Sequence, residues 1–170
     1  QCGHFGGIHP GEGIVLTGGE PLMQSEALIA LIDLLKRDRP TLKIEVETNG
    51  TIAPSAELAS RVDLFMVSPK LAHSGNDAAL TLQPEKLAAF AALPQAYFKF
   101  VARTPEDIAT VAALAEAHAI PAARIYIMPE GVTSEALMAR CQALLQPILA
   151  AGFNFTDRLH IHLFGAQRGV

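Results

Sequence analysis

Six short apolar runs predict six β-strands along the chain. Runs of four to eight residues, rich in β-branched and aromatic side chains and bounded by turn-forming residues, are typical of strands in a sheet core. The central runs lack strict alternation of apolar and polar positions, which indicates strands covered on both faces. The predicted strands are residues 14–17, 42–46, 64–67, 97–101, 124–128 and 159–164.

Two segments between these strands carry apolar residues at helical spacing, which predicts helices with one buried face. Thr104 followed by Pro105 offers an N-cap and a proline at the first helical position. Thr133 or Ser134 can cap the last of these helices. The apolar stripes are Leu28, Leu31, Ile32 and Leu35 in one helix, and Leu137, Cys141, Leu144, Leu145 and Ile148 in the other.

Strands that recur roughly every 20 to 35 residues, with helices in most gaps, predict repeated βα units in a parallel sheet. We expect one α/β domain over residues 1–170, a partial (β/α)6 TIM-like barrel. Residues 1–13 show no hydrophobic period and predict an opened loop, so a first βα unit is expected to be missing. The strand at 14–17 would then lie at an open edge of the sheet.

Glycine, proline and polar residues collect directly after four of the predicted strands. In a barrel of βα units, the loops that follow the strands meet at one face, and ligands bind there. The sequence therefore predicts its functional site at the carboxyl ends of these strands. Residues 71–83 predict a surface loop of the kind that acts as a lid or binding loop. The four strand-end segments are residues 17–21, 47–50, 68–70 and 129–131.

Composition narrows the classes of function. The net charge of −4, with both signs interspersed, gives no basic stripe for a nucleic acid. No apolar run is long enough to span a bilayer, so no membrane partner is expected. The two cysteines make no disulfide framework, which favours a reducing cytoplasm, and two thiolates cannot hold a four-ligand cluster.

The first strand-end segment contains Gly18, Gly19 and Glu20, followed by proline. Two glycines let the backbone approach a ligand closely, and the carboxylate then places a hydrogen-bond acceptor beside it. An acceptor suits an ammonium group and not a phosphate. A plain strand-to-helix turn with a capping acid explains this tetrad about equally well when it is taken alone.

The segment from Leu16 to Leu22 resembles the Gly-Gly-Glu-Pro motif of radical S-adenosylmethionine enzymes. Within that superfamily, further segments are similar in order and placement to those of the 7-carboxy-7-deazaguanine synthases. The likeness covers essentially the whole chain. The further segments are residues 46–51, 67–70, 98–101, 128–131 and 158–170.

The resemblance implies a reaction. Family members use a reduced 4Fe–4S cluster to cleave S-adenosylmethionine, and the resulting 5′-deoxyadenosyl radical takes a hydrogen atom from 6-carboxy-5,6,7,8-tetrahydropterin. The ring contracts with loss of ammonia, assisted by Mg²⁺, and yields 7-carboxy-7-deazaguanine for queuosine and related 7-deazapurines. A carbon–nitrogen lyase of this kind implies an electron donor such as flavodoxin or ferredoxin, and the family tends to form homodimers.

The resemblance also implies site residues, although it assigns no catalytic residue in this chain. Thr17 and Val170 match positions that contact the pterin substrate. The positions that match the family's S-adenosylmethionine site hold the methionine end of the cofactor, where Glu20 would accept from the amino group, and line its ribose and carboxylate side. They are Gly18, Gly19, Glu20, Ser68, Pro69, Lys70, Met128, Pro129, Glu130 and Gly131.

The chain departs from the family pattern before residue 17. The three cluster cysteines and a threonine associated with magnesium are expected upstream of the Gly-Gly-Glu-Pro strand, yet only Cys2 precedes Thr17. Cys2 is interpreted as a loop residue. The sequence thus predicts either a fragment of a longer enzyme or a protein that has lost the activity, of which we favour the fragment. In both cases these 170 residues alone are expected to be inactive.

Other reactive side chains have structural explanations. Cys141 lies on the apolar stripe of a helix, where core packing is expected. His160 and His162 share a face of the predicted last strand, as barrel-lining histidines more than as a metal pair. Lys99 lies within an apolar strand and is expected to face a polar barrel lumen. Glu45 shares a strand face with Glu47, and its carboxylate can also be simply solvated.

Two other functions remain open. One is a radical enzyme that resembles the activases of glycyl-radical proteins, since they share the Gly-Gly-Glu-Pro strand. The other is a non-catalytic protein that binds S-adenosylmethionine or a pterin without a cluster. The Ser-Pro-Lys segment at 68–70 and the Arg-Gly-Val ending at 168–170 count against the activase, and the missing cysteines favour the binding protein.

Overall fold

The computed structural model describes residues 13–71 and 83–167. Within these residues a parallel sheet of six strands runs in the order β1 to β6, each strand beside its neighbours in sequence. This order is that of a (β/α) barrel and not of a doubly wound sheet. The strands are β1 (Gly13–Leu16), β2 (Lys43–Thr48), β3 (Leu64–Val67), β4 (Ala96–Ala102), β5 (Ile125–Pro129) and β6 (Asn154–Phe155).

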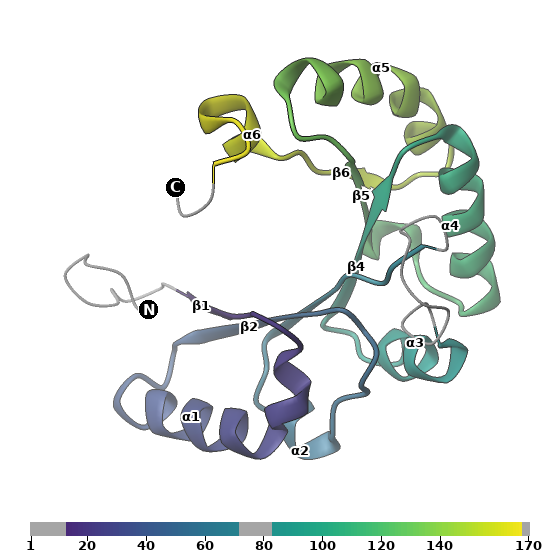
Figure 1. The fold of residues 1–170 in the computed structure, drawn as a ribbon. Coiled ribbons are helices and arrows are strands. Elements are labelled where there is room, and N and C mark those ends of the chain that lie inside the picture. Colours follow the sequence, from purple (N-terminus) through teal and green to yellow (C-terminus); the bar gives the residue numbers. More distant parts are fainter. Residues whose placement is uncertain (1–12, 72–82, 168–170) are drawn as a thin grey trace.

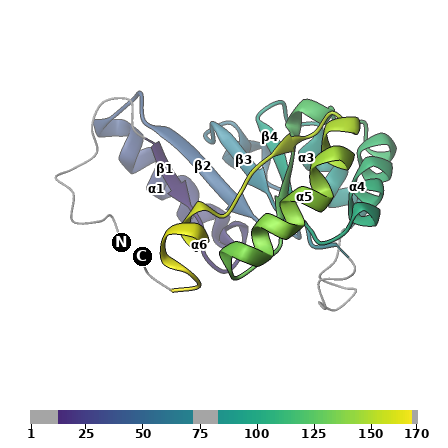
Figure 2. The ribbon, with the colours of Figure 1, turned by 90° about the horizontal axis from the view of Figure 1, so that it is seen from above.

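The helices cover the outer side of a curved sheet. Figure 1 shows the strands following an arc with α1 to α5 outside it, and the view from above in Figure 2 shows the same single layer of helices. The predicted partial barrel is confirmed. The helices are α1 (Ser25–Asp38), α2 (Ala56–Ala59), α3 (Pro84–Ala91), α4 (Pro105–Ala117), α5 (Ser134–Ala150) and α6 (Leu159–Phe164), with 3₁₀ turns η1 (Pro21–Gln24) and η4 (Ala122–Arg124). No helix among the described residues is long and apolar enough to cross a membrane.

The core lies between the sheet and these helices. Alternate residues of β2 to β5 point outward and are almost fully buried there, as the strand burial patterns show. The rings of Phe65 and Phe90 meet edge to face, with centroids 5.8 Å apart. Apolar area removed from water on this face stabilises the fold. The largest of the fully buried side chains from the strands are Ile44, Phe65, Phe98, Phe100, Ile125 and Ile127.

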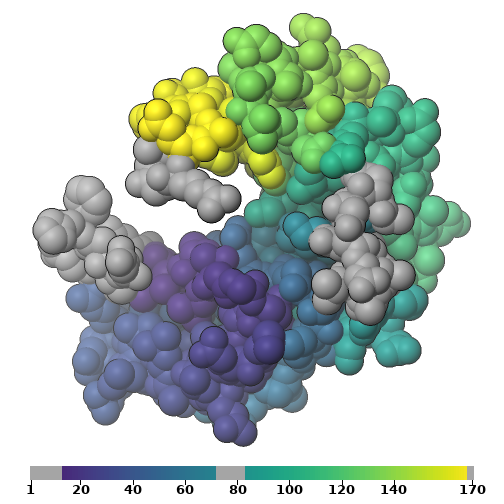
Figure 3. Space-filling view, viewed as in Figure 1, coloured from purple at the N-terminus to yellow at the C-terminus, as the bar shows by residue number. Residues whose placement is uncertain are grey.

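The inner face of the sheet is only partly covered. The intervening residues of β2 to β5 are half-buried, apart from the exposed Lys43, so burial alternates along each strand. The expectation of strands covered on both faces is therefore wrong for the described residues. Within the described residues the barrel is open between β1 and α6, and Figure 3 shows a hollow between these two elements. We call this half-buried inner face the lumen.

Local signals for helix starts are confirmed. Thr104 and Asp107 form a capping box at the start of α4, in which each side chain accepts a hydrogen bond from the other residue's backbone N–H. Thr133 Oγ1 accepts from Ala136 N at 3.2 Å and so caps α5. These caps satisfy donors that the first helical turn would otherwise leave unpaired.

The predicted last strand, residues 159–164, is wrong. These residues form the helix α6, in which Gly165 N donates to Ile161 O at 2.9 Å, and the sixth strand is the two-residue β6. The two histidines of this segment alternate with apolar residues up to Leu163, and such a short pattern fits a strand or a short amphipathic helix equally well. Only Ile161 of α6 is buried, so helical packing uses one apolar position and not an alternating face.

Both ends of the sheet are open within the described chain. There β1 pairs with β2 alone, in the register Gly13 to Lys43 through Leu16 to Val46. This confirms the expected edge strand, and the structure adds Gly13 to it. The expectations for Cys2, for Val170 and for the loop at 71–83 apart from its two end residues fall outside the described residues.

A cluster of charges fastens the start of β3 to β2 and α1. Asp63 accepts from Lys43 Nζ at 2.9 Å, Lys36 Nζ at 3.1 Å and Ile44 N at 3.0 Å. Partial burial acts to raise the pKa of Asp63, but these three donors outweigh it and lower the pKa from 3.8 to about 2. The lowered pKa means that the carboxylate stabilises the fold above the unfolded-state value and loses this effect on acidification.

We expect Asp63→Asn to lower the free energy of unfolding at pH 7 by about 1 to 2 kcal/mol, a value reduced for the solvent exposure of the pair. The difference from wild type should shrink as the pH falls from 3.8 toward 2. Urea unfolding of the full-length protein at several pH values measures it. Asp38→Asn is the matched control, because the Asp38–Arg37 pair is exposed at 77% and 70% of its side chains and should contribute nothing measurable. A pH-independent loss in Asp63→Asn would contradict this assignment.

Candidate functional site

The segments that follow β1, β2, β3 and β5 lie at one edge of the sheet, because parallel strands all point their carboxyl ends the same way. The strands end at Leu16, Thr48, Val67 and Pro129. The structure therefore brings the predicted strand-end segments to the same rim of the barrel. We call this edge the rim.

The turn after β1 is open toward the rim. Gly18 has φ 103° and Gly19 has φ 53°, backbone conformations that side chains with a Cβ rarely adopt. A Cβ placed on either glycine would meet no atom within 4 Å, so the backbone there faces open space. A ligand can approach this turn closely, as the sequence predicts.

Glu20 connects the turn to the end of β2. Its Oε1 accepts from Leu22 N at 3.1 Å and from Thr48 Oγ1 at 2.7 Å, and its Oε2 accepts from Asn49 N at 2.8 Å. The Thr48 hydroxyl belongs to a buried residue, 3% exposed. A carboxylate offers about four acceptor positions, so three donors leave Oε2 with room for another. Glu20 thus supports the loop and retains acceptor capacity for an ammonium group.

The Glu-Thr-Asn-Gly loop after β2 is fixed by short-range bonds. Asn49 Oδ1 accepts from Thr51 N at 2.8 Å, and Gly50 N donates to Thr48 Oγ1 at 3.1 Å. Gly50 has φ 79°, and a Cβ placed there would lie 2.9 Å from Val67 Cγ1 at the end of β3. Glycine is required at this position both for its conformation and for the close approach of the two strand ends.

We expect Gly50→Ala to destabilise the fold by about 2 to 3 kcal/mol, the sum of left-handed strain and overpacking. Gly152→Ala separates these causes. Gly152 also has positive φ, 68°, but a Cβ there would meet only Ala122 Cβ at 3.8 Å, so it should lose about 1 to 2 kcal/mol. Thermal and urea unfolding measure both variants. Equal losses would show that contact with Val67 costs nothing.

The three residues of the Ser-Pro-Lys segment after β3 have different roles. Ser68 is held in place, because its N–H donates to Thr48 O at 2.8 Å and its hydroxyl donates to Lys99 O at 3.1 Å. Pro69 is buried and Lys70 is exposed at the rim. Lys70 is therefore the member whose cationic side chain reaches solvent, where it can meet an anionic ligand group.

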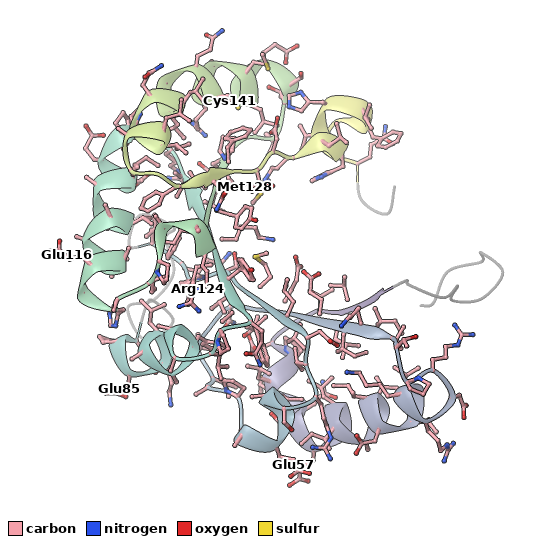
Figure 4. The ribbon with its side chains drawn as sticks, turned by 180° about the vertical axis from the view of Figure 1, so that it is seen from behind. Glu57, Glu85, Glu116, Arg124, Met128 and Cys141 are labelled. Carbon is pink, nitrogen blue, oxygen red and sulfur yellow. The ribbon has the colours of Figure 1, made fainter. Side chains whose placement is uncertain are left out.

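The residues of the loop after β5 also differ in their roles. Met128 is half-buried on the lumen face, and Figure 4 shows it on the inner side of the sheet. The carboxylate of Glu130 instead pairs with Arg103, whose Nη2 donates to it at 2.7 Å, and with Arg140. A Cβ on the buried Gly131 would lie 2.8 Å from Leu137 Cδ2. The Glu130 side chain and Gly131 therefore secure this loop, and Pro129 is buried.

The lumen beneath the rim carries a charged cluster. Lys99 Nζ pairs with Glu47 Oε1 at 3.1 Å, and Thr17 Oγ1 donates to Glu47 Oε2 at 3.4 Å. The lumen position expected for Lys99 is thus confirmed by its partner. Burial first, and then the charge of Glu47, raise the pKa of Glu45, while Lys99 acts against them. We call Glu45, Glu47 and Lys99 the lumen cluster.

An aromatic pair lies next to this cluster. Tyr97 and Tyr126 are half-buried on the lumen face of β4 and β5, with ring centroids 6.2 Å apart and planes at 59°. In the sheet, Lys99 is the register partner of Tyr126, and Met66 that of Tyr97. Apolar ring faces beside paired charges suit a flat, polar heterocycle.

Cys141 and the histidines take no part in the rim. Burial first, and then the nearby carboxylate of Asp157, raise the pKa of the Cys141 thiol, which makes it a poor nucleophile. Cys141 is half-buried on α5 and is not among the buried residues of the core, so its predicted core packing stays a prediction. His160 is exposed on α6, and His162 is bonded to Ser134 and Asp157, so the expected barrel-lining pair on a strand is wrong.

No group of three or more histidine, cysteine or acidic side chains that could hold a metal ion occurs among residues 13–71 and 83–167. The part of the chain that the structure describes therefore does not fit a 4Fe–4S cluster, which needs thiolate ligands.

Sequence reasoning missed the arginines that hold Glu130 and the partners of His162. In each case one partner is far away along the chain, at 27 residues for Arg103 and Glu130 and 28 for Ser134 and His162. The other partner is nearer, at 10 residues for Arg140 and Glu130 and 5 for Asp157 and His162. No local pattern marks such pairs. A partial signal for the lumen cluster was present in the sequence, because Glu45 and Glu47 share one face of a strand and Lys99 lies within an apolar strand.

Comparisons with known proteins give a consistent result. The chain is 34% identical to a 7-carboxy-7-deazaguanine synthase from Pyrobaculum aerophilum over 156 residues, 92% of this chain and 67% of that protein. Enzymes of the same name from Rhodopirellula baltica and Halobacterium salinarum are 32% and 34% identical, covering 92% and 89% of this chain. The chain spans about two thirds of these relatives, namely 67%, 63% and 64%. No protein-family model matches the sequence.

Among solved structures, the fold is similar to a domain of a pyruvate-formate lyase-activating enzyme from Bacteroides vulgatus, with a TM-score of 0.56. The similarity covers 87% of this chain and 99% of that domain at 21% identity. At this identity the likeness supports the partial barrel and carries no conclusion about substrate.

Proposed function

We propose, from the premise that this chain belongs to the 7-carboxy-7-deazaguanine synthase family, that the full-length protein converts 6-carboxy-5,6,7,8-tetrahydropterin to 7-carboxy-7-deazaguanine. The observation that carries the proposal is the open Gly18-Gly19 turn, which lies on the rim directly above the lumen cluster in a chain with these relatives. Such a carbon–nitrogen lyase supplies the precursor of queuosine and related 7-deazapurines.

The rim fits S-adenosylmethionine. The backbone at Gly18 and Gly19 leaves the space that side chains would fill, and Oε2 of Glu20 keeps acceptor capacity for the methionine ammonium. Lys70 is an exposed cation suited to the methionine carboxylate. Ser68, Pro69 and the loop Met128 to Gly131 would line the ribose side. When bound, the cofactor supplies the 5′-deoxyadenosyl radical.

The lumen is the proposed binding site of the pterin. Thr17 and Glu47 offer a hydroxyl and a carboxylate to a ring that carries N–H donors, and Lys99 offers a cation beside them. Tyr97 and Tyr126 provide apolar ring faces. These groups are proposed to bind and orient the ring. Lys99 balances the charge of one of the two carboxylates of the lumen cluster. Val170 is a further proposed contact.

The 4Fe–4S cluster and Mg²⁺ belong to the proposal only through the family. The described residues offer no group of three ligands for either, so their ligands are proposed to come from elsewhere in the full-length protein. An electron donor such as flavodoxin or ferredoxin, a homodimer and a cytoplasmic location are proposed on the same basis.

One competing function has an observation in its favour. A non-catalytic protein that binds S-adenosylmethionine or a pterin would need no cluster, and the described residues contain no cluster site. An activase of glycyl-radical proteins has weaker support, because the activase domain shares only the fold.

The test supplies the full-length protein, kept anaerobic and reduced, with S-adenosylmethionine and the carboxypterin, and follows products by mass spectrometry. The proposal predicts 7-carboxy-7-deazaguanine that depends on both compounds. Tight pterin binding without product by a full-length protein that carries no cluster would contradict it and favour the binding protein. A glycyl radical raised in a partner polypeptide would favour the activase.

A further inference from the structure

We propose that His162 is a positioning residue that ties α6 to the start of α5, and thereby holds in place the loop Met128 to Gly131, which leads into α5. The inference rests on the proposed function, because that loop is proposed to line the cofactor. His162 itself is not proposed to touch either ligand.

The imidazole of His162 bridges two segments. Its Nδ1 lies 2.7 Å from Ser134 Oγ, on the first residue of α5, and its Nε2 lies 3.0 Å from Asp157 Oδ2, in the loop before α6. The side chains of His162 and Asp157 are 19% and 32% exposed, so water competes only partly for these bonds. Both ring nitrogens are therefore engaged.

A second tie runs parallel to the first. Arg158, the residue before α6, donates from Nη1 to Gly131 O at 3.4 Å. Its backbone N–H also donates to Asp157 Oδ1 at 2.7 Å, so one carboxylate holds both the helix start and His162. The loop after β5 is thus fastened to α6 at Gly131 and, through Ser134, at the beginning of α5.

Apolar packing holds α6 only weakly. Of its six residues only Ile161 is buried, at 5% exposure, whereas Leu159, Leu163 and Phe164 are 65%, 63% and 50% exposed. A six-residue helix is far below the length at which a helix is stable alone in water. Hydrogen bonds from side chains must therefore supply much of what holds α6 in place.

Imidazole suits this position because one nitrogen accepts while the other donates. In the neutral ring, Nδ1 accepts from the serine hydroxyl and Nε2–H donates to Asp157. A glutamine side chain presents the same pair of functions from one amide. Phenylalanine keeps the ring shape but has neither, which leaves the Asp157 carboxylate without this partner.

Coupling has a kinetic consequence. When α6 is released, the loop Met128 to Gly131 loses its ties through Gly131 and Ser134. Binding of S-adenosylmethionine, which this loop is proposed to line, then weakens, while the chemical step, carried out by groups elsewhere, keeps its rate. A rise in KM at constant kcat is the signature of lost binding that is equal in ground and transition states.

The experiment uses the full-length protein and compares His162→Phe, His162→Gln and Leu163→Gln. Hydrogen exchange in His162→Phe should speed up about tenfold in residues 159–165 and 131–134, as expected for the loss of one hydrogen bond to a carboxylate and one to a hydroxyl. The KM for S-adenosylmethionine should rise about fivefold with kcat within about twofold of wild type. His162→Gln should retain wild-type behaviour, and so should Leu163→Gln, an exposed position on the same helix.

Three results would overturn the inference: unchanged exchange in His162→Phe, faster exchange without a change in KM, or a glutamine variant as impaired as the phenylalanine one. The exchange measurement needs no turnover. If the wild type forms no 7-carboxy-7-deazaguanine, the proposed function fails while the tie between α6 and α5 is still tested.

Discussion

Replacement of Glu20 by alanine is expected to weaken the binding of S-adenosylmethionine by about 100-fold, as expected for the loss of a charged hydrogen-bond acceptor at a ligand. The same change removes the acceptor for Leu22 N, Thr48 Oγ1 and Asn49 N. Because Thr48 is buried, its hydroxyl would lose the acceptor for its proton, and stability should fall by about 2 to 3 kcal/mol. Equilibrium dialysis and urea unfolding of the full-length protein measure the two effects.

Glu20→Gln distinguishes ligand binding from loop support. Its amide oxygen can still accept from Leu22 N and Thr48 Oγ1, so about half of the stability should return. It lacks a negative charge for the cofactor's ammonium group, so binding should stay at least about tenfold weak. Glu26→Ala, an exposed acid in the first turn of α1, is the control. Wild-type affinity in Glu20→Gln would exclude Glu20 from the cofactor site.

The second large effect is expected for Lys99→Met. The change leaves Glu45 and Glu47 side by side in the lumen without the cation that pairs with Glu47 at 3.1 Å. We expect kcat/KM for the carboxypterin to fall by about 10- to 100-fold, which corresponds to the loss of a charged hydrogen bond in a partly buried site. Steady-state kinetics of the full-length enzyme measures the loss.

Lys99→Met should also change how stability depends on pH. Lys99 lowers the pKa of Glu45, against burial and the charge of Glu47, so its removal raises that pKa further above 4.5. A raised carboxyl pKa destabilises the fold where the group is ionised, and this penalty disappears as the pH falls through the raised value toward 4.5.

Urea unfolding of Lys99→Met should therefore show a larger deficit at pH 7.5 than at pH 5. Lys99→Arg, which keeps the charge, should recover most of the activity and stability. Lys86→Met in the outer helix α3 serves as the control for loss of a lysine. An equal deficit at both pH values would mean that Lys99 does not act on Glu45.

Much of the fold was predictable because each strand core is a compact apolar run. The strands β1 to β5 agree with the predicted runs within one or two residues, and the caps at Thr104 and Thr133 were marked by local residue types. These features depend on neighbours along the chain. Local sequence therefore carries them.

The end of the chain was not predictable in the same way. The strand β6 is two residues long, Asn154 and Phe155, and is defined by pairing with Tyr126 and Ile127. Such a strand has no periodicity of its own. The helix α6 has one buried residue, Ile161, and is held by side-chain bonds to α5, which no local pattern reveals.

The candidate site divides along similar lines. The roles of Gly18 and Gly19 could be predicted from the backbone freedom of glycine. The lumen position of Lys99 could be predicted from the cost of burying a charge. Glu130 was predicted to line the cofactor, yet its carboxylate pairs with Arg103 and Arg140. The direction in which a side chain at the rim points depends on its partners, which belong to other elements of the fold.

The iron and sulfide content of the native full-length protein, purified without oxygen and measured together with its intact mass, tests the central claim most directly. About four irons and matching sulfide per chain, as one 4Fe–4S cluster requires, in a protein several kilodaltons heavier than the 18.1 kDa of these residues, is the expected result. A native mass equal to these 170 residues with no iron would contradict a radical enzyme and leave a binding protein in its place.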